Sequence, residues 1–273
     1  MKSITLGQYF AGDSILHRLD PRAKIILAIL YIVVTFLCKN VFSFVLLVAS
    51  VFILVAISRI PLKIILGGIK PVLYIMIFTV VINIFWTKGE GDPLVSWSFI
   101  KIYKEGLINA TLMMLRIVSL IIGTGIFLTY TTSPIVLTDA IEQLLDPLKK
   151  IKVPVHEFAM MMTIALRFIP TLVEETDKIM NAQKARGADF SHGSLINRAK
   201  ALIPVLVPLF ISAFRRADEL AVAMECRCYR GGEGRTRMTK LKYSFKDAAA
   251  LLVIVLFGTA VVLLNIFAPG FSM

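Results

Sequence analysis

Two stretches of the sequence each place a single arginine between small residues. They read AQKARGAD around Arg186 and AMECRCYRGG around Arg227. An arginine guanidinium is always charged and presents a planar fork of donors that fits carboxylates and carbonyl oxygens. The candidate site residues are Ala185, Arg186, Gly187, Cys226, Arg227 and Cys228. This chemistry is recognition rather than catalysis, because each arginine can enter an acidic or carbonyl-lined groove of a partner.

An ordinary helix C-terminus is the simpler interpretation of the first triplet. A cation at Arg186 meets the negative end of the helix dipole, and Gly187 suits a left-handed cap. The second triplet weakens this interpretation, because Arg227 is followed by Cys228 and the next glycine comes only at Gly231. Capping alone therefore does not predict both triplets, and their repetition favours two partner contacts.

Metal and cofactor chemistry is not expected. Cys226 and Cys228 supply two thiols, but no histidine lies near them in the sequence to complete a tetrahedral set. Together with Cys38 they are predicted to be free thiols, since three cysteines give neither an even disulfide framework nor a C-x-x-C pair. The three methionines at 160–162 are more typical of an adaptable packing surface than of a metal site.

No nucleotide-binding loop is found in the sequence. A phosphate loop of the form G-x-x-x-x-G-K-[ST] is absent. The GGEG run at 231–234 is glycine-rich, but it lacks the lysine and a preceding strand, so it is interpreted as a linker. No catalytic residue is therefore predicted.

Long amphipathic helices are expected to position both arginines. In the run 155–186 apolar side chains recur every three or four residues opposite a charged face, and the run 202–229 repeats the design. At about 1.5 Å per residue the first would measure roughly 50 Å, with a kink at Pro170. One short helix is predicted in the segment 133–154 before them. Small residues would let the two long helices cross closely; they are Ala182, Ala185, Ala213, Ala217 and Ala221.

The composition is that of an integral membrane protein. Hydrophobic residues make up 57% of the 273 residues, and the mean hydropathy is +0.79. These values are too apolar for a soluble domain of this length. The formal net charge of +12 is first explained by Lys and Arg that anchor cytoplasmic loops, so the expected partner is a lipid bilayer and not a nucleic acid.

Five apolar runs predict an all-α membrane protein with five spanning helices. They cover residues 25–38, 41–58, 71–87, 107–130 and 248–267. The segment 133–247 differs, because it holds 18 of the 30 basic and 13 of the 18 acidic residues. We therefore predict a membrane domain of four helices at 1–132, a cytoplasmic helical domain at 133–247 and a last membrane helix at 248–273.

The loop charges predict the orientation in the membrane. Ten Lys and Arg flank the membrane runs on one side, against four on the other. Because cytoplasmic loops carry the excess of Lys and Arg, the N-terminus is predicted to lie inside and the C-terminus outside. The loop 88–106 would then face outward and the segment 133–247 inward.

The chain also resembles a known family, the transmembrane T component of energy-coupling factor (ECF) transporters, a subclass of the ABC transporters. Four stretches carry the resemblance: GQYFAGDSILHRLDPRAK at 7–24, TTSPIVLTDAIEQLLDPLK, and the two arginine stretches. The family implies five membrane helices and three cytoplasmic coupling helices. It also implies that the second and third coupling helices end in arginine motifs, here at Arg186 and Arg227, which dock into two ATPase subunits.

The resemblance implies a function as well as a fold. The chain would be a non-catalytic subunit in the bacterial cell membrane that takes no cofactor and serves uptake of vitamins or other micronutrients. ATP would be hydrolysed by the two ATP-binding cassette partners, and a membrane-embedded substrate-binding S component would contact the region of the methionines. Cysteines replace the alanine and glycine common in the second motif, which leaves its cap geometry open.

The alternative function is an ion-coupled secondary transporter. Such carriers often keep a carboxylate at membrane depth, whereas the five predicted spans contain no Asp or Glu. Arg116 is their only charge, and it would contact either backbone carbonyls of the bundle or the substrate-binding partner. A membrane enzyme is disfavoured, because no paired carboxylates, nucleophile with base, or metal cluster falls within the spans.

Overall fold

The computed structural model describes residues 9–10, 12–86, 95–97, 100–190, 194–231 and 241–267. The described chain is mainly helical, as the sequence predicts. It divides into two compact units, which we call the bundle unit, Gly7–Ala140 with Lys240–Met273, and the crossed-helix unit, Ile141–Thr239. The predicted cytoplasmic segment 133–247 contains the whole crossed-helix unit and extends beyond it at both ends. Both chain termini and the run 232–234 lie outside the described residues.

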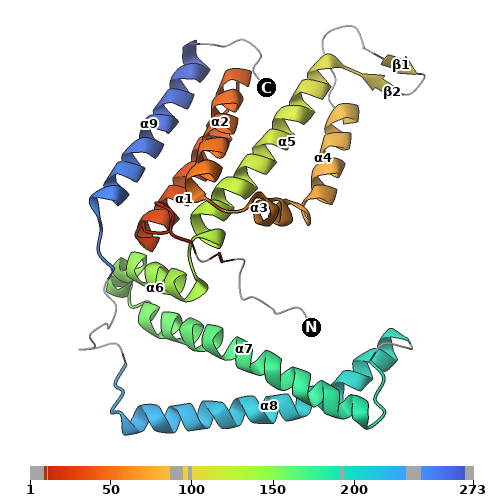
Figure 1. Cartoon of the computed structure of the whole chain (residues 1–273), viewed down its shortest axis with the longest axis vertical. Helices are drawn as coiled ribbons and strands as arrows, with labels where there is room; N and C mark the ends of the chain where they lie inside the picture. Colours follow the sequence, from red (N-terminus) through yellow and green to blue (C-terminus); the bar gives the residue numbers. More distant parts are fainter. Residues whose placement is uncertain are drawn as a thin grey trace. The chain divides into compact units, whose positions relative to one another are not determined.

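The bundle unit is built from apolar helices that pack side by side (Figure 1). In chain order its elements are α1 (Pro21–Leu37), α2 (Val41–Ser58), α3 (Leu62–Ile69), α4 (Leu73–Trp86), the antiparallel strands β1 (Val95–Trp97) and β2 (Ile100–Ile102), α5 (Lys104–Thr124), the π-helix η1 (Gly125–Tyr130), the first residues of α6 (Pro134–Leu144), and α9 (Phe245–Phe267). Helix α5 packs against α1 and α2 on one side and α4 on the other, while α9 lies along α1.

The core of the bundle unit lies where α1, α2 and α5 meet. Its most buried side chains include Tyr31, Phe44 and Leu47. Gly123 on α5 is required at this contact, because a Cβ there would overlap the ring of Tyr31. The apolar side chains that face away from the core on α2, α4 and α9 are exposed, as expected of helices whose outer surface is covered by lipid.

The membrane runs differ in detail from the prediction. The third run forms α4, but a helix that was not predicted, α3, precedes it, and the two are bent by 58° where the chain turns between Ile69 and Leu73. The fourth run begins earlier, at Lys104, and ends in the π-helix η1, which apolar periodicity alone did not reveal. Helix α1 has 17 residues, which is fewer than the roughly 20 that a helix needs to span the hydrocarbon core of a bilayer.

Hydropathy and length mark several described helices as able to cross a membrane. They are Val41–Ser58, Lys104–Tyr130, Ile196–Cys226 and Phe245–Phe267, with up to one more if the bent pair α3–α4 is a single span. Ile196–Cys226 belongs to the segment predicted to be cytoplasmic. Within this helix the stretch 201–214 is uncharged, and the charged residues Arg215, Arg216, Asp218 and Glu219 follow it directly.

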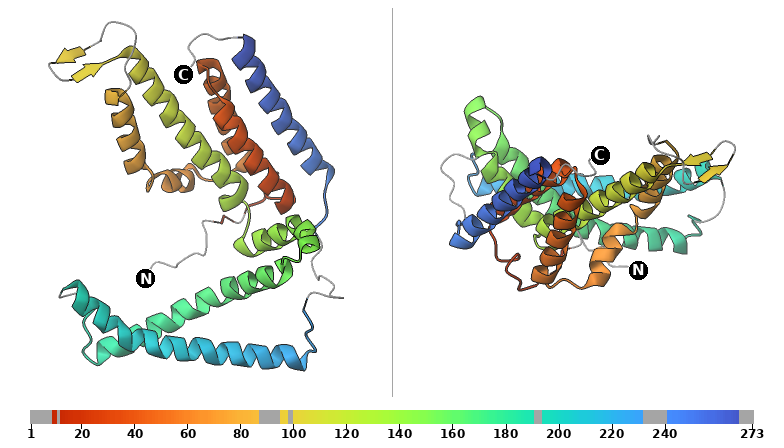
Figure 2. Two further views of the ribbon diagram at one scale, coloured as in Figure 1. Left: turned by 180° about the vertical axis from the view of Figure 1, so that it is seen from behind. Right: turned by 90° about the horizontal axis from the view of Figure 1, so that it is seen from above.

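The crossed-helix unit consists mainly of two long helices that cross (Figure 2). Its elements are the end of α6, the 3₁₀-helix η2 (Asp146–Ile151), α7 (Val155–Ala185) and α8 (Leu195–Cys226). The single short helix predicted before Pro154 is thus an α-helix followed by a 3₁₀ segment. Helix α7 continues through Pro170 without a break, and α8 begins at Leu195, earlier than the predicted 202.

Candidate coupling site

The first arginine triplet forms the C-terminal cap of α7. Arg186 is the C-cap residue, and Gly187 follows in the left-handed region at φ 89°. The amide of Gly187 donates to the Lys184 carbonyl at 3.0 Å, and the amide of Ala188 donates to the Gln183 carbonyl at 3.0 Å. These two bonds define a Schellman motif, which satisfies carbonyls that the helix end would otherwise leave unpaired.

The second triplet closes α8 in the same way. Arg227 is the C-cap residue, and Cys228 takes the left-handed position at φ 53°. The Cys228 amide donates to the Glu225 carbonyl at 2.8 Å, and the Tyr229 amide donates to the Met224 carbonyl at 3.0 Å. The expectation that capping cannot account for both triplets is therefore wrong, because Cys228 itself adopts the conformation that Gly187 adopts in the first motif.

Both triplets are accessible to a partner. All six residues are exposed. Within the described chain, no hydrogen bond or ion pair engages the guanidinium of Arg186 or of Arg227. Identical caps therefore present two available guanidinium groups, each at the tip of a long helix.

Polar and small residues hold α7 and α8 together where they cross. Arg216 Nη2 lies 2.7 Å from Glu175 Oε2, and Gln183 Nε2 donates to the Pro204 carbonyl at 3.4 Å. The pairing of 175 with 216 and of 183 with 204 makes the two helices antiparallel. Their C-terminal arginines therefore lie at opposite ends of the pair.

The helix segments from the ion pair to the two arginines form arms of equal length. Arg186 follows Glu175 by eleven residues, and Arg227 follows Arg216 by eleven residues. At about 1.5 Å per residue, each arm measures roughly 16 Å from the ion pair to its arginine. A change of crossing angle at the ion pair would therefore displace both arginines by similar amounts.

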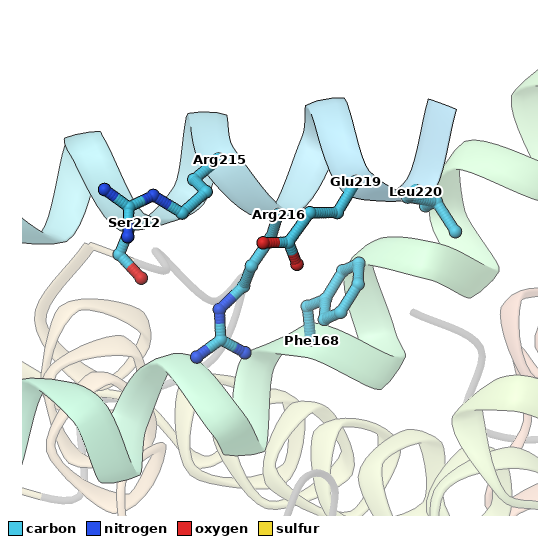
Figure 3. Close-up of a pocket in the computed structure, with 6 residues that line it drawn as sticks. All are labelled: Phe168, Ser212, Arg215, Arg216, Glu219 and Leu220. Carbon is cyan, nitrogen blue, oxygen red and sulfur yellow. The ribbon is translucent and has the colours of Figure 1, made fainter. Parts of the chain in front are cut away.

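Two open pockets flank the crossing. The larger, about 520 Å³, is lined by Phe168, Ser212, Arg215, Arg216, Glu219 and Leu220. Figure 3 shows the Arg216 side chain extending from α8 toward α7, where the ring of Phe168 also lies. The smaller, about 150 Å³, includes Ala213 and Ala217, two of the small residues predicted at the crossing, opposite Ile164 and Leu172.

The histidines of the described chain have structural contacts, and its cysteines are unpaired. His17 lies 2.7 Å from Ser14 Oγ and 2.9 Å from the Phe10 carbonyl, and His156 lies 2.9 Å from Glu142. Among the described residues, no group of three His, Cys, Asp or Glu side chains is arranged to hold a metal ion. Cys38 is buried, whereas Cys226 and Cys228 are exposed free thiols.

Arg116 contacts the bundle itself. Its Nη2 donates to the carbonyl of Cys38, the C-cap residue of α1, at 2.7 Å, and its guanidinium carbon lies 5.2 Å from the centre of the Phe44 ring. Of the two roles that the sequence left open, the structure shows the contact with a backbone carbonyl, and the contact with the substrate-binding partner stays a prediction. A cation at this position also suits the negative end of the α1 dipole.

The Glu175–Arg216 pair was not predicted as a contact. Both residues were placed on charged helix faces, which are ordinarily solvent-facing. Their pairing depends on the register in which α7 and α8 cross, and a single sequence does not contain that register.

Comparison with known proteins supports a common family across nearly the whole chain. Residues 12–238 match the CbiQ family, described as cobalt transport protein. A protein of Clostridium kluyveri is 57% identical over 252 residues, covering 92% of this chain and 93% of its own length. Proteins of Ruminiclostridium cellulolyticum, 56% identical over 97% of this chain and 98% of the relative, and of Bacillus subtilis, 49% identical over 93% and 96%, are similar.

All three relatives carry the same name, energy-coupling factor transporter transmembrane protein EcfT. The match covers the bundle helices α1 to α5 and the crossed helices that carry both arginine caps. The chain therefore belongs to the CbiQ family, as a transmembrane T component of the energy-coupling factor transporters.

Proposed function

We propose that this chain couples two ATPase subunits to a membrane-embedded, substrate-binding S component in the uptake of vitamins or other micronutrients. The chain is a non-catalytic subunit of its transporter, since the T component leaves ATP hydrolysis to other subunits. The observation that carries the proposal is the pair of identical caps, which present Arg186 and Arg227 at opposite ends of two antiparallel helices. Two separated guanidinium groups suit two separate partner subunits.

The mechanism we propose is mechanical. ATP binds more tightly to the closed ATPase pair than to the open pair, and this differential affinity drives closure. Each ATPase would hold one arginine in an acidic or carbonyl-lined groove. Closure would then change the angle at which α7 and α8 cross. The open pockets beside the Glu175–Arg216 pair would leave room for such a change, and the equal arms would distribute it evenly.

The contact with the S component would use the apolar side chains that the crossed-helix unit exposes. Phe210, Phe214 and Leu206 on α8 are each at least half exposed, at 62%, 66% and 51%, and Met161 on α7 is exposed by 57%. Isolated exposed apolar residues are ordinary, but a continuous apolar helix face indicates a binding surface. Burial of these exposed apolar side chains against an apolar partner within the membrane is more favourable than their exposure to water.

We further propose that the protein resides in the bacterial cell membrane with its N-terminus in the cytoplasm. The excess of Lys and Arg on one side of the membrane runs supports this orientation. It would place the crossed-helix unit, and with it both arginines, on the side where ATP is available to the partners.

Substitution of the two arginines tests the function. We expect Arg186→Ala and Arg227→Ala each to impair uptake of a radiolabelled vitamin by vesicles that contain the subunit with its ATPases and an S component. Truncating one partner of a desolvated charged contact typically costs about 2 to 5 kcal/mol. The double variant should lose ATPase association almost completely. Lysine at either position should restore activity only in part, because it lacks the planar fork.

The control is Arg198→Ala, which removes an exposed cation from the first turn of α8. Membrane insertion of every variant is measured first, and uptake is compared at equal amounts of inserted protein. Helix-end cations contribute only roughly 0.3 to 1 kcal/mol of local stability. Near-normal uptake and ATPase association in the double alanine variant would therefore contradict the proposed function.

A further inference from the structure

A buried polar cluster lies at one end of the bundle unit, and it takes no part in the coupling site described above. Asp247, Lys24 and Asp20 are 1%, 2% and 6% exposed. With Arg22 they provide two carboxylates and two cations, so the formal charge of the group is balanced. We call Asp20, Arg22, Lys24 and Asp247 the joint cluster. Asp20, Lys24 and Asp247 are buried and Arg22 is partly exposed. Burial of ionisable side chains is costly unless each finds partners.

Asp247 connects the first turns of two helices. It is the third residue of α9, and its Oδ2 accepts the amide of Ser244, just before that helix, at 2.6 Å. Its Oδ1 accepts the amide of Asp20, the N-cap residue of α1, at 2.8 Å. A carboxylate that returns to the amide preceding its own helix is half of a capping box. Here the second oxygen extends the cap to another helix.

Arg22 reinforces the same connection. Its guanidinium binds the Asp20 carboxylate, with Nη2 2.9 Å from Oδ2, and its central carbon lies 4.0 Å from the centre of the Tyr243 ring. The start of α1 is thus joined to the start of α9 by a hydrogen bond and by a cation–π contact.

Lys24 connects α1 to a third segment, the end of η1. Its Nζ donates to the Thr131 carbonyl at 2.9 Å and to Thr132 Oγ1 at 3.2 Å. A third bond, at 3.3 Å, reaches the His17 carbonyl in the segment before α1. Three acceptors match the three donors of an ammonium group, and this satisfied geometry explains how a lysine can be so deeply buried.

The segments that the joint cluster binds flank the crossed-helix unit in the chain. The bundle unit ends after Ala140, soon after Thr131 and Thr132, and resumes at Lys240, just before Tyr243 and Ser244. Both covalent connections to the crossed-helix unit are therefore fastened to the first turn of α1. We propose that the joint cluster fixes these two connections to each other, so that motion of the crossed-helix unit is passed to the bundle as a whole and is not lost by local flexing.

The physical basis is the cost of separating buried charged partners. Movement of one connection relative to the other would leave a buried carboxylate or ammonium without its partners, which is strongly unfavourable. The two connections should therefore move together. This inference rests on the proposed coupling function, in which Lys24 and Asp247 are positioning residues that do not touch the ATPases.

The test compares coupling with assembly in the complete transporter. Lys24→Met removes the three ammonium donors, Asp247→Asn replaces one acceptor oxygen by a donor that faces either the Ser244 or the Asp20 amide, and Thr132→Val is a milder change that removes one acceptor. The matched control is Asn265→Ala at the other end of α9, which removes bonds to the Leu37 carbonyl and to Ser43. Complexes are purified, reconstituted in vesicles at equal amounts, and assayed for vitamin taken up per ATP hydrolysed.

We expect the ratio of uptake to hydrolysis to fall several-fold in Lys24→Met and Asp247→Asn and to a smaller extent in Thr132→Val. Asn265→Ala should keep the wild-type ratio even if less complex assembles. An unchanged ratio in Thr132→Val and Asp247→Asn, or an equal fall in Asn265→Ala, would overturn the inference. Failure of this inference can be distinguished from failure of the proposed function. The proposed function fails only if the double arginine variant keeps its uptake and its ATPase association, and that result does not depend on the joint cluster variants.

Discussion

Cys228 has a backbone conformation that residues other than glycine rarely adopt. Its φ is 53°, and it occupies the position that glycine occupies at the end of α7. For a residue with a Cβ this conformation costs roughly 1 to 2 kcal/mol. The cost is offset by the two bonds of the Schellman motif, which keep the end of α8 closed. The orientation of Arg227 therefore depends on a slightly strained neighbour.

Relief of this strain is a testable consequence. We expect Cys228→Gly to stabilise the cap by about 0.5 to 1 kcal/mol. Glycine relieves the strain of the left-handed conformation, and this gain is partly offset by the larger backbone entropy that glycine loses on folding. Amide exchange at Tyr229, which donates to the Met224 carbonyl, should then slow roughly two- to fivefold. Gly187→Ala should have the opposite effect at Ala188, since a Cβ at Gly187 meets nothing within 4 Å and its cost is conformational.

The control for these measurements is Cys226→Ala, which changes an exposed thiol on the helical side of Arg227. It should leave exchange at Tyr229 unchanged. Faster exchange in Cys228→Gly than in the unaltered chain would contradict a strained cap.

The arginines could be recognised from the sequence, but their caps could not be fully described. A lone arginine between small residues at the end of an amphipathic run is visible as a pattern, and it occurs at both Arg186 and Arg227. The left-handed conformation of Cys228 is not visible, because a propensity argument assigns that role to glycine. The hydrogen bonds of the helix end decide it, and they depend on the backbone path beyond the helix.

The Glu175–Arg216 pair joins α7 and α8 in the C-terminal half of each helix. Glu175 and Arg216 are partly exposed, at 24% and 32% of their side-chain surface, so water screens part of their attraction. Pockets on the same stretch leave few other constraints. The ion pair should therefore define the register of the crossing more than it stabilises the unit.

Charge reversal measures this contribution. Glu175→Arg and Arg216→Glu should each lower stability because each places like charges together, and the combined variant should recover most of the loss. A double-mutant cycle should give a coupling energy of about 0.5 to 1 kcal/mol, typical of a partly exposed pair. Denaturant unfolding of the purified subunit provides the measurement. Strictly additive effects of the two reversals would show that the residues do not interact.

Sequence patterns predicted the existence of most elements better than their ends. The amphipathic period located α7 and α8, and apolar runs located α2, α5 and α9. Helix α3 was missed because Lys63 and Lys70 made its residues resemble a loop between two apolar runs. The π-helix at Gly125–Tyr130 was missed because an apolar run has the same hydropathy whether its helix is regular or widened. The early start of α8 was missed because the charged residues Arg198 and Lys200 concealed its first turns.

At the scale of the whole molecule, the two units differ in how their apolar residues are used. In the bundle unit the outward helix faces are apolar, and the buried ionisable groups Asp20, Lys24 and Asp247 lie together at one end. In the crossed-helix unit apolar and charged side chains alternate along the same helices, and both arginine tips are exposed. This contrast supports a membrane location for the first and an aqueous boundary for the second, and it makes the orientation of the chain testable.

The native cysteines provide the test of orientation. Cys226 and Cys228 are exposed and lie in the unit predicted to be cytoplasmic, whereas Cys38 is buried. A membrane-impermeant maleimide should therefore label the subunit, expressed without its partners, in inside-out vesicles and not in intact cells. In a Cys226→Ser and Cys228→Ser background the signal should vanish, and Ser96→Cys, in the loop 88–106, should then be labelled from intact cells. Labelling of Cys226 or Cys228 from the outer face would contradict the loop-charge argument, and it would place both arginine caps on the side of the membrane away from ATP.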